Sequence, residues 1–414
     1  MSTFSIPALE TALQTRLPAT LDFLRELVGI NSYSCHRAGV EENAARIIAQ
    51  FDKFGFKASR VPCRDEGTGD HLFLDSGGDG PVIACISHLD TVFTAEEEAA
   101  NDFHWREEPA EGRIYGPGTM DIKGGTAMIW LLLDAMAETM PELFRSIRWI
   151  LAWNAAEERL TPCFGEACRA IFPDDTRAAL VFEADSGKPG AEPPFCILES
   201  RKGWAKYRVE VLGRGAHAGS VHEAGANAIH QLARTIDRLQ NLTDYDRDVS
   251  VNVGVLSGGS VVNRVPHQAG AELEMRTYDP DRFEEYKQKI EAFSGPGEIT
   301  AASDGFACEV KVSLLREAPP WPRNPGTDGL VAQWKAAAAE YGVGLNATRR
   351  GGISDGNFLC DRFPTLDGVG IRGGNAHASE RSADGTKVPE YVDVTSFVPK
   401  TLINLLAIRN IVAG

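Results

Sequence analysis

The chain has 414 residues, 43% of them hydrophobic and 24% charged, which is typical of a folded protein long enough for two domains. Its formal net charge of −16 disfavours nucleic acid or an anionic membrane as the main partner. No apolar run reaches the roughly 18–20 residues of a spanning helix, and the first residues lack the pattern of a secretory signal. We therefore expect a cytoplasmic protein that binds no membrane, whose eight scattered cysteines are free thiols.

The first half of the chain alternates between two patterns. Helical periodicity covers residues 9–28, 41–54 and 124–140, and apolar runs typical of strands buried on both faces cover residues 81–87, 147–153 and 179–182. Strands that alternate with helices predict an α/β sheet whose functional residues gather at the strand ends.

A second pattern begins near residue 202. Strand-like stretches at 204–212, 249–256, 269–278 and 306–315 are interrupted by helical stretches at 226–242 and 280–293. The order β-α-β-β-α-β predicts a ferredoxin-like unit. A further helical stretch at 328–341 follows it, so we expect this unit, residues 202–315, to be inserted in a domain formed by residues 1–201 and 316–414.

Metal-ligating side chains recur in five separate motifs. They are His88 in Ser-His-Leu-Asp-Thr-Val, Asp121 in Gly-Pro-Gly-Thr-Met-Asp-Ile-Lys-Gly-Gly, Glu158 in Ala-Ala-Glu-Glu-Arg, Glu183 in Val-Phe-Glu-Ala-Asp, and His377 in Gly-Gly-Asn-Ala-His. Two imidazoles and three carboxylates suit two divalent ions that share one carboxylate. Glu157, beside a ligand but not needed as one, is left free as a base. This is the inventory of a two-metal hydrolase.

Three of these motifs have competing interpretations. The glycine-rich stretch 116–125 superficially resembles a phosphate loop, but Lys123 is followed by glycine and not by Ser or Thr. Asp185 lies two residues beyond Glu183 and is a rival ligand from the same strand end. Asp90, two residues beyond His88, can accept the second N–H of that imidazole, or it can be an ordinary loop residue.

The five motifs together resemble the M20 family of zinc-dependent carboxypeptidases and amidohydrolases, the glutamate carboxypeptidase type in particular, over nearly the whole chain. The resemblance implies a two-domain α/β metallohydrolase, with a mixed sheet flanked by helices and an inserted ferredoxin-like lid and dimerisation domain. It implies two Zn²⁺ per subunit, for which Co²⁺ or Mn²⁺ could substitute. It also implies that Asp121 bridges the ions and precedes a cis peptide bond, that Asp90 orients His88, and that Glu157 is the general base.

The same resemblance assigns residues to the substrate. His217, in Gly-Ala-His-Ala-Gly, corresponds to a histidine that reaches the partner subunit's site and polarises the scissile carbonyl. Asn263 and Arg276 correspond to positions that bind the substrate backbone and carboxylate, and Gly373 to a further substrate contact. The segment 351–357 resembles one that shapes the pocket. Departures from the family pattern lie around the glutamate pair, and in an insertion at 379–387 that delays the usual Glu390-Tyr391-Val continuation and is expected to reshape the rim.

Three functions are compatible with these residues. The first is a carboxypeptidase or dipeptidase that releases an amino acid whose free carboxylate is held by Arg276. The second is a hydrolase of N-acyl or N-carbamoyl amino acids. The third is a binding protein without activity, which would be expected to have lost a ligand or the base, and none is missing. We expect a homodimer that acts on a peptide or an N-acyl amino acid.

Overall fold

The structure, a computed structural model, describes residues 5–160, 162–185, 187 and 192–413, and separates into two units. The first unit comprises Met1–Glu199, Arg323–Arg349 and Ser354–Gly414, and the second Ser200–Pro322 and Arg350–Ile353. None of the described helices combines the length and apolarity needed to span a bilayer.

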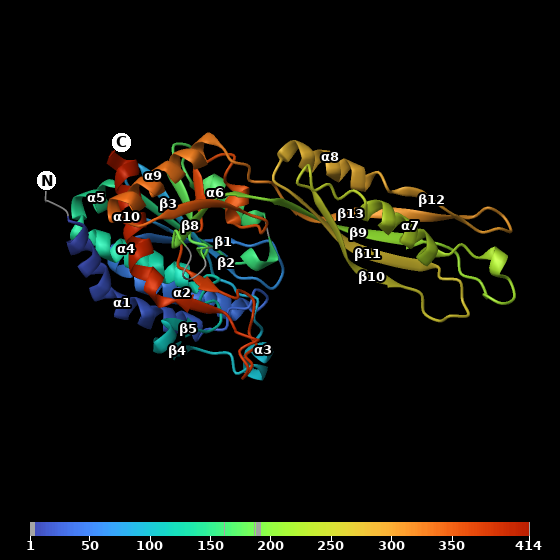
Figure 1. Ribbon diagram of the computed structural model, residues 1–414, viewed down its shortest axis with the longest axis horizontal. Helices are drawn as coiled ribbons and strands as arrows, with labels where there is room; N and C mark the ends of the chain where they lie inside the picture. The colour runs from blue at the N-terminus through green and yellow to red at the C-terminus, as the bar shows by residue number, and fades with distance from the viewer. Residues whose placement is uncertain (1–4, 161, 186, 188–191, 414) are drawn as a thin grey trace. The chain divides into compact units, whose positions relative to one another are not determined.

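An eight-stranded mixed sheet forms the centre of the first unit (Figure 1). Its order is β1 (Lys57–Pro62), β2 (Asp70–Asp75), β6 (Arg148–Asn154), β3 (Val82–His88), β7 (Ala178–Val181), β15 (Thr365–Asp367), β8 (Phe195–Arg201) and β14 (Leu345–Arg350). The four central strands, β6, β3, β7 and β15, are parallel to one another. On either side of them, β2 pairs with β6 and β8 pairs with β15, both antiparallel.

Alternate residues of the central strands enter two different cores. In β3, Ile83 and Cys85 pack into the larger core, while Ala84 and Ile86 pack into the smaller one on the other face. The larger core is covered by α1 (Ile6–Val28), α2 (Arg37–Phe51), α4 (Lys123–Thr139), α9 (Pro325–Tyr341) and α10 (Phe397–Ala413). The smaller core is covered by α6 (Cys163–Ile171).

Short elements complete the first unit. They are the helices α3 (Ala95–Ala100) and α5 (Pro141–Ser146), and a small sheet in the order β16 (Gly373–Gly374), β17 (Tyr391–Asp393), β5 (Arg113–Tyr115) and β4 (Arg106–Glu108).

The second unit is a five-stranded antiparallel sheet with two helices. Its elements are β9 (Gly203–Leu212), α7 (Ala228–Gln240), β10 (Ser250–Gly258), β11 (Gln268–Thr277), α8 (Pro280–Glu291), β12 (Gly295–Thr300) and β13 (Ala307–Ala318). The strands lie in the order β10-β11-β9-β13-β12. The strands β10, β11, β9 and β13, together with α7 and α8, have the order of a ferredoxin-like fold. The expected two-domain α/β fold is therefore confirmed.

The edge strand β12 was not expected from the sequence. It begins Gly-Pro-Gly, and both residue types are depleted in strands. Proline is tolerated on an edge strand because no second neighbour needs its missing N–H. The pairing of β12 with β13 is correspondingly irregular between Pro296 and Thr300.

Candidate active site

Three neighbouring parallel strands deliver side chains to one edge of the large sheet. His88 is the last residue of β3 and lies in register with Asn154, the last residue of β6. Glu157 and Glu158 follow β6 directly, and Glu183 follows β7. Because the carboxyl ends of parallel strands meet at one edge, residues far apart in sequence converge there.

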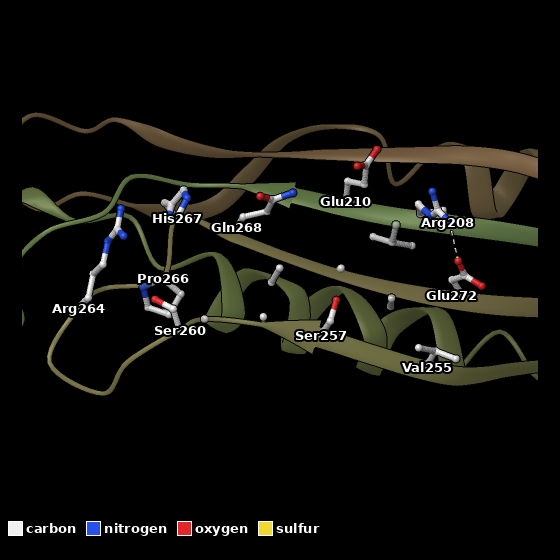
Figure 2. A pocket seen from close by; sticks show the side chains of 16 residues that line it. Arg208, Glu210, Val255, Ser257, Ser260, Arg264, Pro266, His267, Gln268 and Glu272 are labelled. Carbon is white, nitrogen blue, oxygen red and sulfur yellow. Dashed lines mark hydrogen bonds and ion pairs between the residues drawn. The ribbon is translucent and has the colours of Figure 1, made fainter.

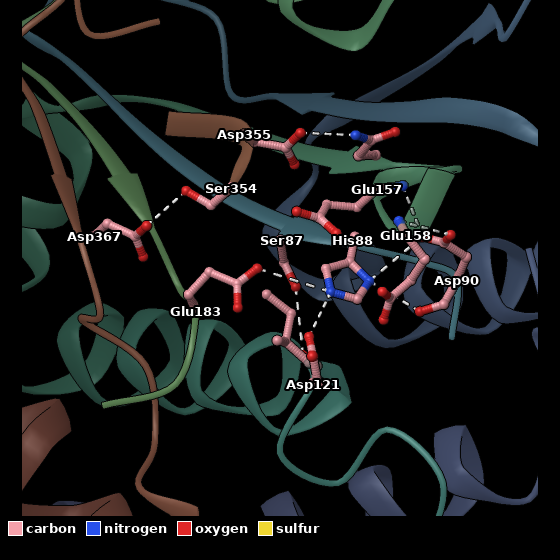
Figure 3. Close-up of polar contacts among 12 residues, drawn as sticks. Ser87, His88, Asp90, Asp121, Glu157, Glu158, Glu183, Ser354, Asp355 and Asp367 are labelled. Atoms are coloured by element: carbon pink, nitrogen blue, oxygen red, sulfur yellow. Dashed lines mark hydrogen bonds and ion pairs between the residues drawn. The ribbon is translucent and has the colours of Figure 1, made fainter. Parts of the chain in front are cut away.

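His88 is fully buried and faces two of the predicted carboxylates (Figure 3). Its Nε2 lies 3.0 Å from Oδ1 of Asp121 and 3.9 Å from Oε1 of Glu183. Its Nδ1 lies 2.9 Å from the carbonyl oxygen and 3.4 Å from the carboxylate Oδ1 of Asp90. Asp90 therefore faces the imidazole nitrogen opposite the carboxylates, which suits a residue that fixes the orientation of a ligand histidine.

His377 meets the same aspartate from the other side. Its Nε2 lies 3.1 Å from Oδ2 of Asp121 and 3.2 Å from Oε2 of Glu158. Asp121 thus directs one carboxylate oxygen to each histidine, as a bridging ligand would. The peptide bond between Asp121 and Ile122 is cis, which confirms that expectation.

The donor set fits divalent cations. His88, Asp121 and Glu158 each offer a ligand atom within 4.8 Å of the others. In addition, Oε1 of Glu158 is buried without a hydrogen-bond partner among the described residues, which is costly for a carboxylate that has nothing to coordinate. Imidazole nitrogens and carboxylate oxygens suit zinc, cobalt or manganese.

The ionisation of these groups reflects their mutual proximity. Hydrogen bonds with Asp121 and Glu158 raise the pKa of His377 to about 11. Burial and the charge of Asp121 raise the pKa of Glu158 to about 7. Burial, followed by the charges of Glu183 and Glu158 and opposed by His88, raises the pKa of Glu157 well above its ordinary value. A divalent cation would favour the deprotonated form of each of these groups.

Asp90 has a second function that the sequence did not indicate. Its carboxylate accepts hydrogen bonds from the backbone amides of Glu157 at 3.0 Å and Glu158 at 3.3 Å, and from the hydroxyl of Ser34 at 2.6 Å. One aspartate therefore orients a predicted ligand histidine and also fixes the backbone of the predicted base and its neighbour.

Glu390 braces the opposite side of the site. Its Oε1 accepts from the amides of Met120 at 2.9 Å and Asp121 at 3.2 Å, and its Oε2 from the amide of His377 at 3.3 Å. Burial and the charge of Asp121 raise its pKa to about 8. In the sequence, Glu390 stands out only as part of the delayed Glu390-Tyr391-Val continuation after His377. The motif was therefore recognised, but the hydrogen bonds that Glu390 accepts were not predicted.

A polar network also supports the turn after β6. The side-chain oxygen of Asn154 accepts from the amide of Ala156 at 2.9 Å, and its nitrogen donates to Asp355 at 2.7 Å. Asp355 lies in the segment 351–357 that was expected to shape the pocket.

The choice between Glu183 and Asp185 has a clear structural basis. The carboxylate of Asp185 lies 3.0 Å from the buried ammonium of Lys400 and accepts a hydrogen bond from the amide of Cys196 at 3.0 Å. It is therefore committed elsewhere, while Glu183 is the carboxylate that approaches His88.

Gly373 has a steric role in the small sheet. A Cβ atom there would lie 2.3 Å from the carbonyl oxygen of Tyr391, so only glycine fits between β16 and β17. The insertion at 379–387 contributes to a cavity of about 670 Å³ that His377, Ser379, Lys387 and Glu97 help to line. The rim beside His377 is therefore built partly from this insertion.

The candidates in the second unit are less tightly held. His217 is exposed and lies on a loop bridged to the loop of Asn263, whose carbonyl accepts a hydrogen bond from the amide of Ala218 at 3.0 Å. Arg276 is already paired, because its Nε and Nη2 lie 2.9 and 3.0 Å from the carboxylate oxygens of Glu274. Its Nη1 donates to the carbonyl of Gly351 at 2.8 Å.

A groove on the second unit contains none of the predicted site residues (Figure 2). Its volume is about 540 Å³, and Arg208, Val255, Arg264, His267 and Glu272 are among the side chains that line it. Most of its lining comes from β9, β10 and β11.

Comparisons with known proteins agree with this architecture. Residues 200–297 match the family model of the M20 peptidase dimerisation domain. The chain is 26% identical over 395 residues to carboxypeptidase G2 of Pseudomonas sp. strain RS-16, covering 93% of this chain and 87% of the relative. It is 24% identical over 359 residues to succinyl-diaminopimelate desuccinylase of Nitrosospira multiformis, covering 84% and 87%.

Solved structures share the fold. Aminopeptidase PepT from Bacillus cereus superposes with a TM-score of 0.72 at 20% identity, covering 96% of this chain and 99% of that chain. The M20 family metallo-carboxypeptidase Sso-CP2 from Sulfolobus solfataricus superposes with a TM-score of 0.67 at 17% identity, covering 95% and 99%. The match to the dimerisation-domain model and the similarity to these relatives and structures support a metallohydrolase of the M20 peptidase and amidohydrolase type.

Proposed function

We propose that the protein is a zinc-dependent hydrolase that cleaves an amide bond and releases a C-terminal amino acid, as a carboxypeptidase or dipeptidase does. The observation that carries this proposal is the position of Asp121, whose two oxygens lie 3.0 and 3.1 Å from the Nε2 atoms of His88 and His377. His88, Asp121 and Glu183 would hold one divalent ion, and Asp121, Glu158 and His377 would hold the other.

The two ions, when bound, supply Lewis acidity that polarises a carbonyl and lowers the pKa of water. Glu157 takes the proton of the attacking water and returns it to the nitrogen of the leaving amine. Its burial, which raises the pKa of this carboxyl, supports the role because a base that must later act as an acid has to hold its proton near neutral pH. Asp90 keeps Glu157 in place through the backbone amide.

The second unit is assigned to dimerisation and to substrate binding. β10 is an edge strand of its sheet and carries the exposed side chains of Val255 and Leu256, and Val262 on the loop that follows is also exposed. Unpaired edges with apolar side chains favour association, and the matching family model describes a dimerisation domain. We assign a second copy of this chain as the partner, with His217 polarising the scissile carbonyl in the partner's site and Asn263 contacting the substrate backbone.

A second candidate reaction is hydrolysis of an N-acyl amino acid. It is favoured by relatives named as succinyl-diaminopimelate desuccinylase and acetylornithine deacetylase. Their sequences are 24% and 26% identical to this chain over the aligned residues. Both reactions use the same ligands and the same base. In either case Arg276 would exchange its contact with Glu274 for the substrate carboxylate, which its planar guanidinium matches.

A substrate screen tests the proposal. Zinc-loaded protein is assayed with dipeptides, with N-acetyl and N-succinyl amino acids, and with the same compounds amidated at the carboxyl end. We expect cleavage of dipeptides that depends on metal and is lost on amidation. Preferential cleavage of acyl amino acids would replace the first reaction with the second, and no cleavage of either class by metal-loaded dimer would contradict the proposal.

A further inference from the structure

A second cluster of reactive side chains lies in the first unit, apart from the predicted ligands. Cys63 follows β1, His71 is the second residue of β2, and Cys163 is the first residue of α6. The sulfurs of Cys63 and Cys163 are 3.3 Å apart, and Nε2 of His71 lies 3.1 Å from the sulfur of Cys163. His71 is fully buried, Cys163 is 6% exposed and Cys63 is half-buried.

A backbone hydrogen bond fixes the tautomer of the His71 imidazole. The amide of Ala155 donates to Nδ1 of His71 at 3.1 Å, so this nitrogen carries no proton. In a neutral imidazole the proton must then be on Nε2, which donates to the sulfur of Cys163. The histidine is therefore a hydrogen-bond donor to a cysteine that can act as the acceptor.

This arrangement argues against a thiolate metal site. A metal on Nε2 would require the proton on Nδ1, where the amide of Ala155 already points a hydrogen.

Three features converge on the sulfur of Cys163. It receives the Nε2–H of His71, it lies at the first position of a nine-residue helix, and it neighbours the thiol of Cys63. Donors and helix N-termini stabilise a thiolate, which is the reactive form of cysteine. The hydrogen bond with Cys163, followed by burial, raises the pKa of Cys63 to about 11, so Cys63 remains a thiol at neutral pH. The two cysteines are thus differentiated into a nucleophile and its neighbour.

We propose that Cys63 and Cys163 are an oxidation site that hydrogen peroxide converts to a disulfide. The thiolate of Cys163 attacks one peroxide oxygen, the O–O bond breaks, and the departing hydroxide takes a proton to leave as water. The sulfur of Cys63 then attacks the sulfenic sulfur of Cys163, and the S–OH bond breaks with release of a second water that carries the proton of Cys63. The peroxide gains the two electrons that the two thiols lose. The sulfurs need to approach from 3.3 Å to a bond of about 2.05 Å.

The oxidation site is linked to the segment that carries the predicted base. Cys163 lies five residues beyond Glu158, and Ala155, whose amide holds His71, lies two residues before Glu157. A disulfide would tie this segment to the connection that follows β1 and weaken the acceptor of His71. We therefore expect oxidation to lower turnover severalfold, a consequence that rests on the proposed function.

Peptide mapping tests the bond without reference to activity. The reduced protein is treated with excess hydrogen peroxide, blocked with an alkylating reagent and digested with trypsin. Cleavage at arginines places Cys63 in the fragment 61–64 and Cys163 in the fragment 160–169, which also contains Cys168. We expect these fragments to be linked in the wild type and in Cys168→Ser, the matched control, and unlinked in Cys63→Ser and Cys163→Ser.

The role of His71 is tested by measuring how fast the disulfide between Cys63 and Cys163 forms. His71→Phe should slow disulfide formation about tenfold, because a hydrogen bond to a charged acceptor is lost, and His71→Gln should restore part of the rate. Turnover of oxidised wild type, compared with peroxide-treated Cys63→Ser, separately measures the functional consequence.

Two results would overturn the oxidation site. One is oxidation of other cysteines while the Cys168→Ser protein shows no link between the two fragments. The other is a bound zinc equivalent that is lost in both Cys63→Ser and Cys163→Ser, which would assign the cluster to a metal instead.

Discussion

The edge of the large sheet and the second unit carry the two parts of the predicted machinery, and they are built very differently. At the sheet edge, Asp90 and Glu390 accept five backbone amide hydrogen bonds in total, from Glu157, Glu158, Met120, Asp121 and His377. In the second unit, His217 is exposed, and Arg276 is occupied by Glu274.

This difference indicates that the predicted metal ligands are preorganised within the first unit, whereas the predicted substrate contacts are not. His88, Glu158 and Glu183 lie at or just beyond strand ends, and Asp121 and His377 lie on loops of the same unit. The chain alone therefore brings the predicted ligands together. The second-unit candidates have polar groups that are either exposed or engaged within their own unit, so their proposed roles depend on substrate or on a second copy. Loss of a sheet-edge residue should therefore have a larger effect than loss of a second-unit residue.

The largest effect is expected at the adjacent glutamates. Glu157→Gln should lower kcat by about 10²–10⁴ with metal content unchanged, since the amide keeps the shape but cannot accept a proton. Glu158→Gln, the matched neighbour, should lose metal as well as activity. Metal analysis and turnover of both variants check this, and metal loss in Glu157→Gln with retention in Glu158→Gln would reverse the two assignments.

His217→Ala should lower kcat by about 10²–10³, the usual cost of removing a group that stabilises an oxyanion. If the histidine serves the partner's site, mixing His217→Ala chains with Glu157→Gln chains should restore part of the activity, because a mixed dimer then has one intact site. Chain exchange is verified by tagged subunits. Exchange without recovered activity would assign His217 to its own subunit or remove it from the reaction.

Arg276→Met should raise KM about tenfold to a hundredfold for substrates with a free carboxylate and leave kcat nearly unchanged, because charge-assisted hydrogen bonds are lost in both the ground state and the transition state. Amidated analogues provide the control, since their weak binding should not respond to the variant. Equal effects on free and amidated compounds would indicate that Arg276 has only a structural contact with Glu274.

Zinc affinity should weaken as the pH falls. The hydrogen bonds with Asp121 and Glu158 raise the pKa of His377 to about 11, and burial and the charge of Asp121 raise that of Glu158 to about 7. Both groups must be deprotonated to bind, so the dissociation constant should rise about tenfold per pH unit for each proton displaced. The dependence should steepen below about pH 7, where Glu158 also holds a proton. Zinc titration calorimetry measures this, and an affinity independent of pH would count against these ligands.

The elements of the fold were predictable where periodicity was strong. The helices near residues 9–28 and 124–140, and the strands near 81–87 and 147–153, are present as α1, α4, β3 and β6 with ends shifted by a few residues. The strand β12 was not predicted, because the Gly-Pro-Gly at its start has low strand propensity. Only its pairing with β13 in the folded structure supports it.

The candidate site was predictable as a set of ligand types, but its supporting contacts were not. His88, Asp121 and His377 stand out because their chemistry recurs in distinct motifs, whereas the bracing role of Glu390 depends on amides 13 and about 270 residues away. The pairing of Cys63 with Cys163 was not predicted for the same reason. These cysteines are 100 residues apart and meet only in the folded chain.

The account rests most directly on Asp121 bridging two ions, and diffraction at the zinc absorption edge from crystals grown with zinc measures this. We expect two anomalous peaks about 3.5–4 Å apart, with Asp121 between them. One peak should lie within about 2.0–2.1 Å of Nε2 of His88 and the other at the same distance from Nε2 of His377. A single peak at saturating zinc, or two peaks that leave Asp121 uncoordinated, would contradict the account.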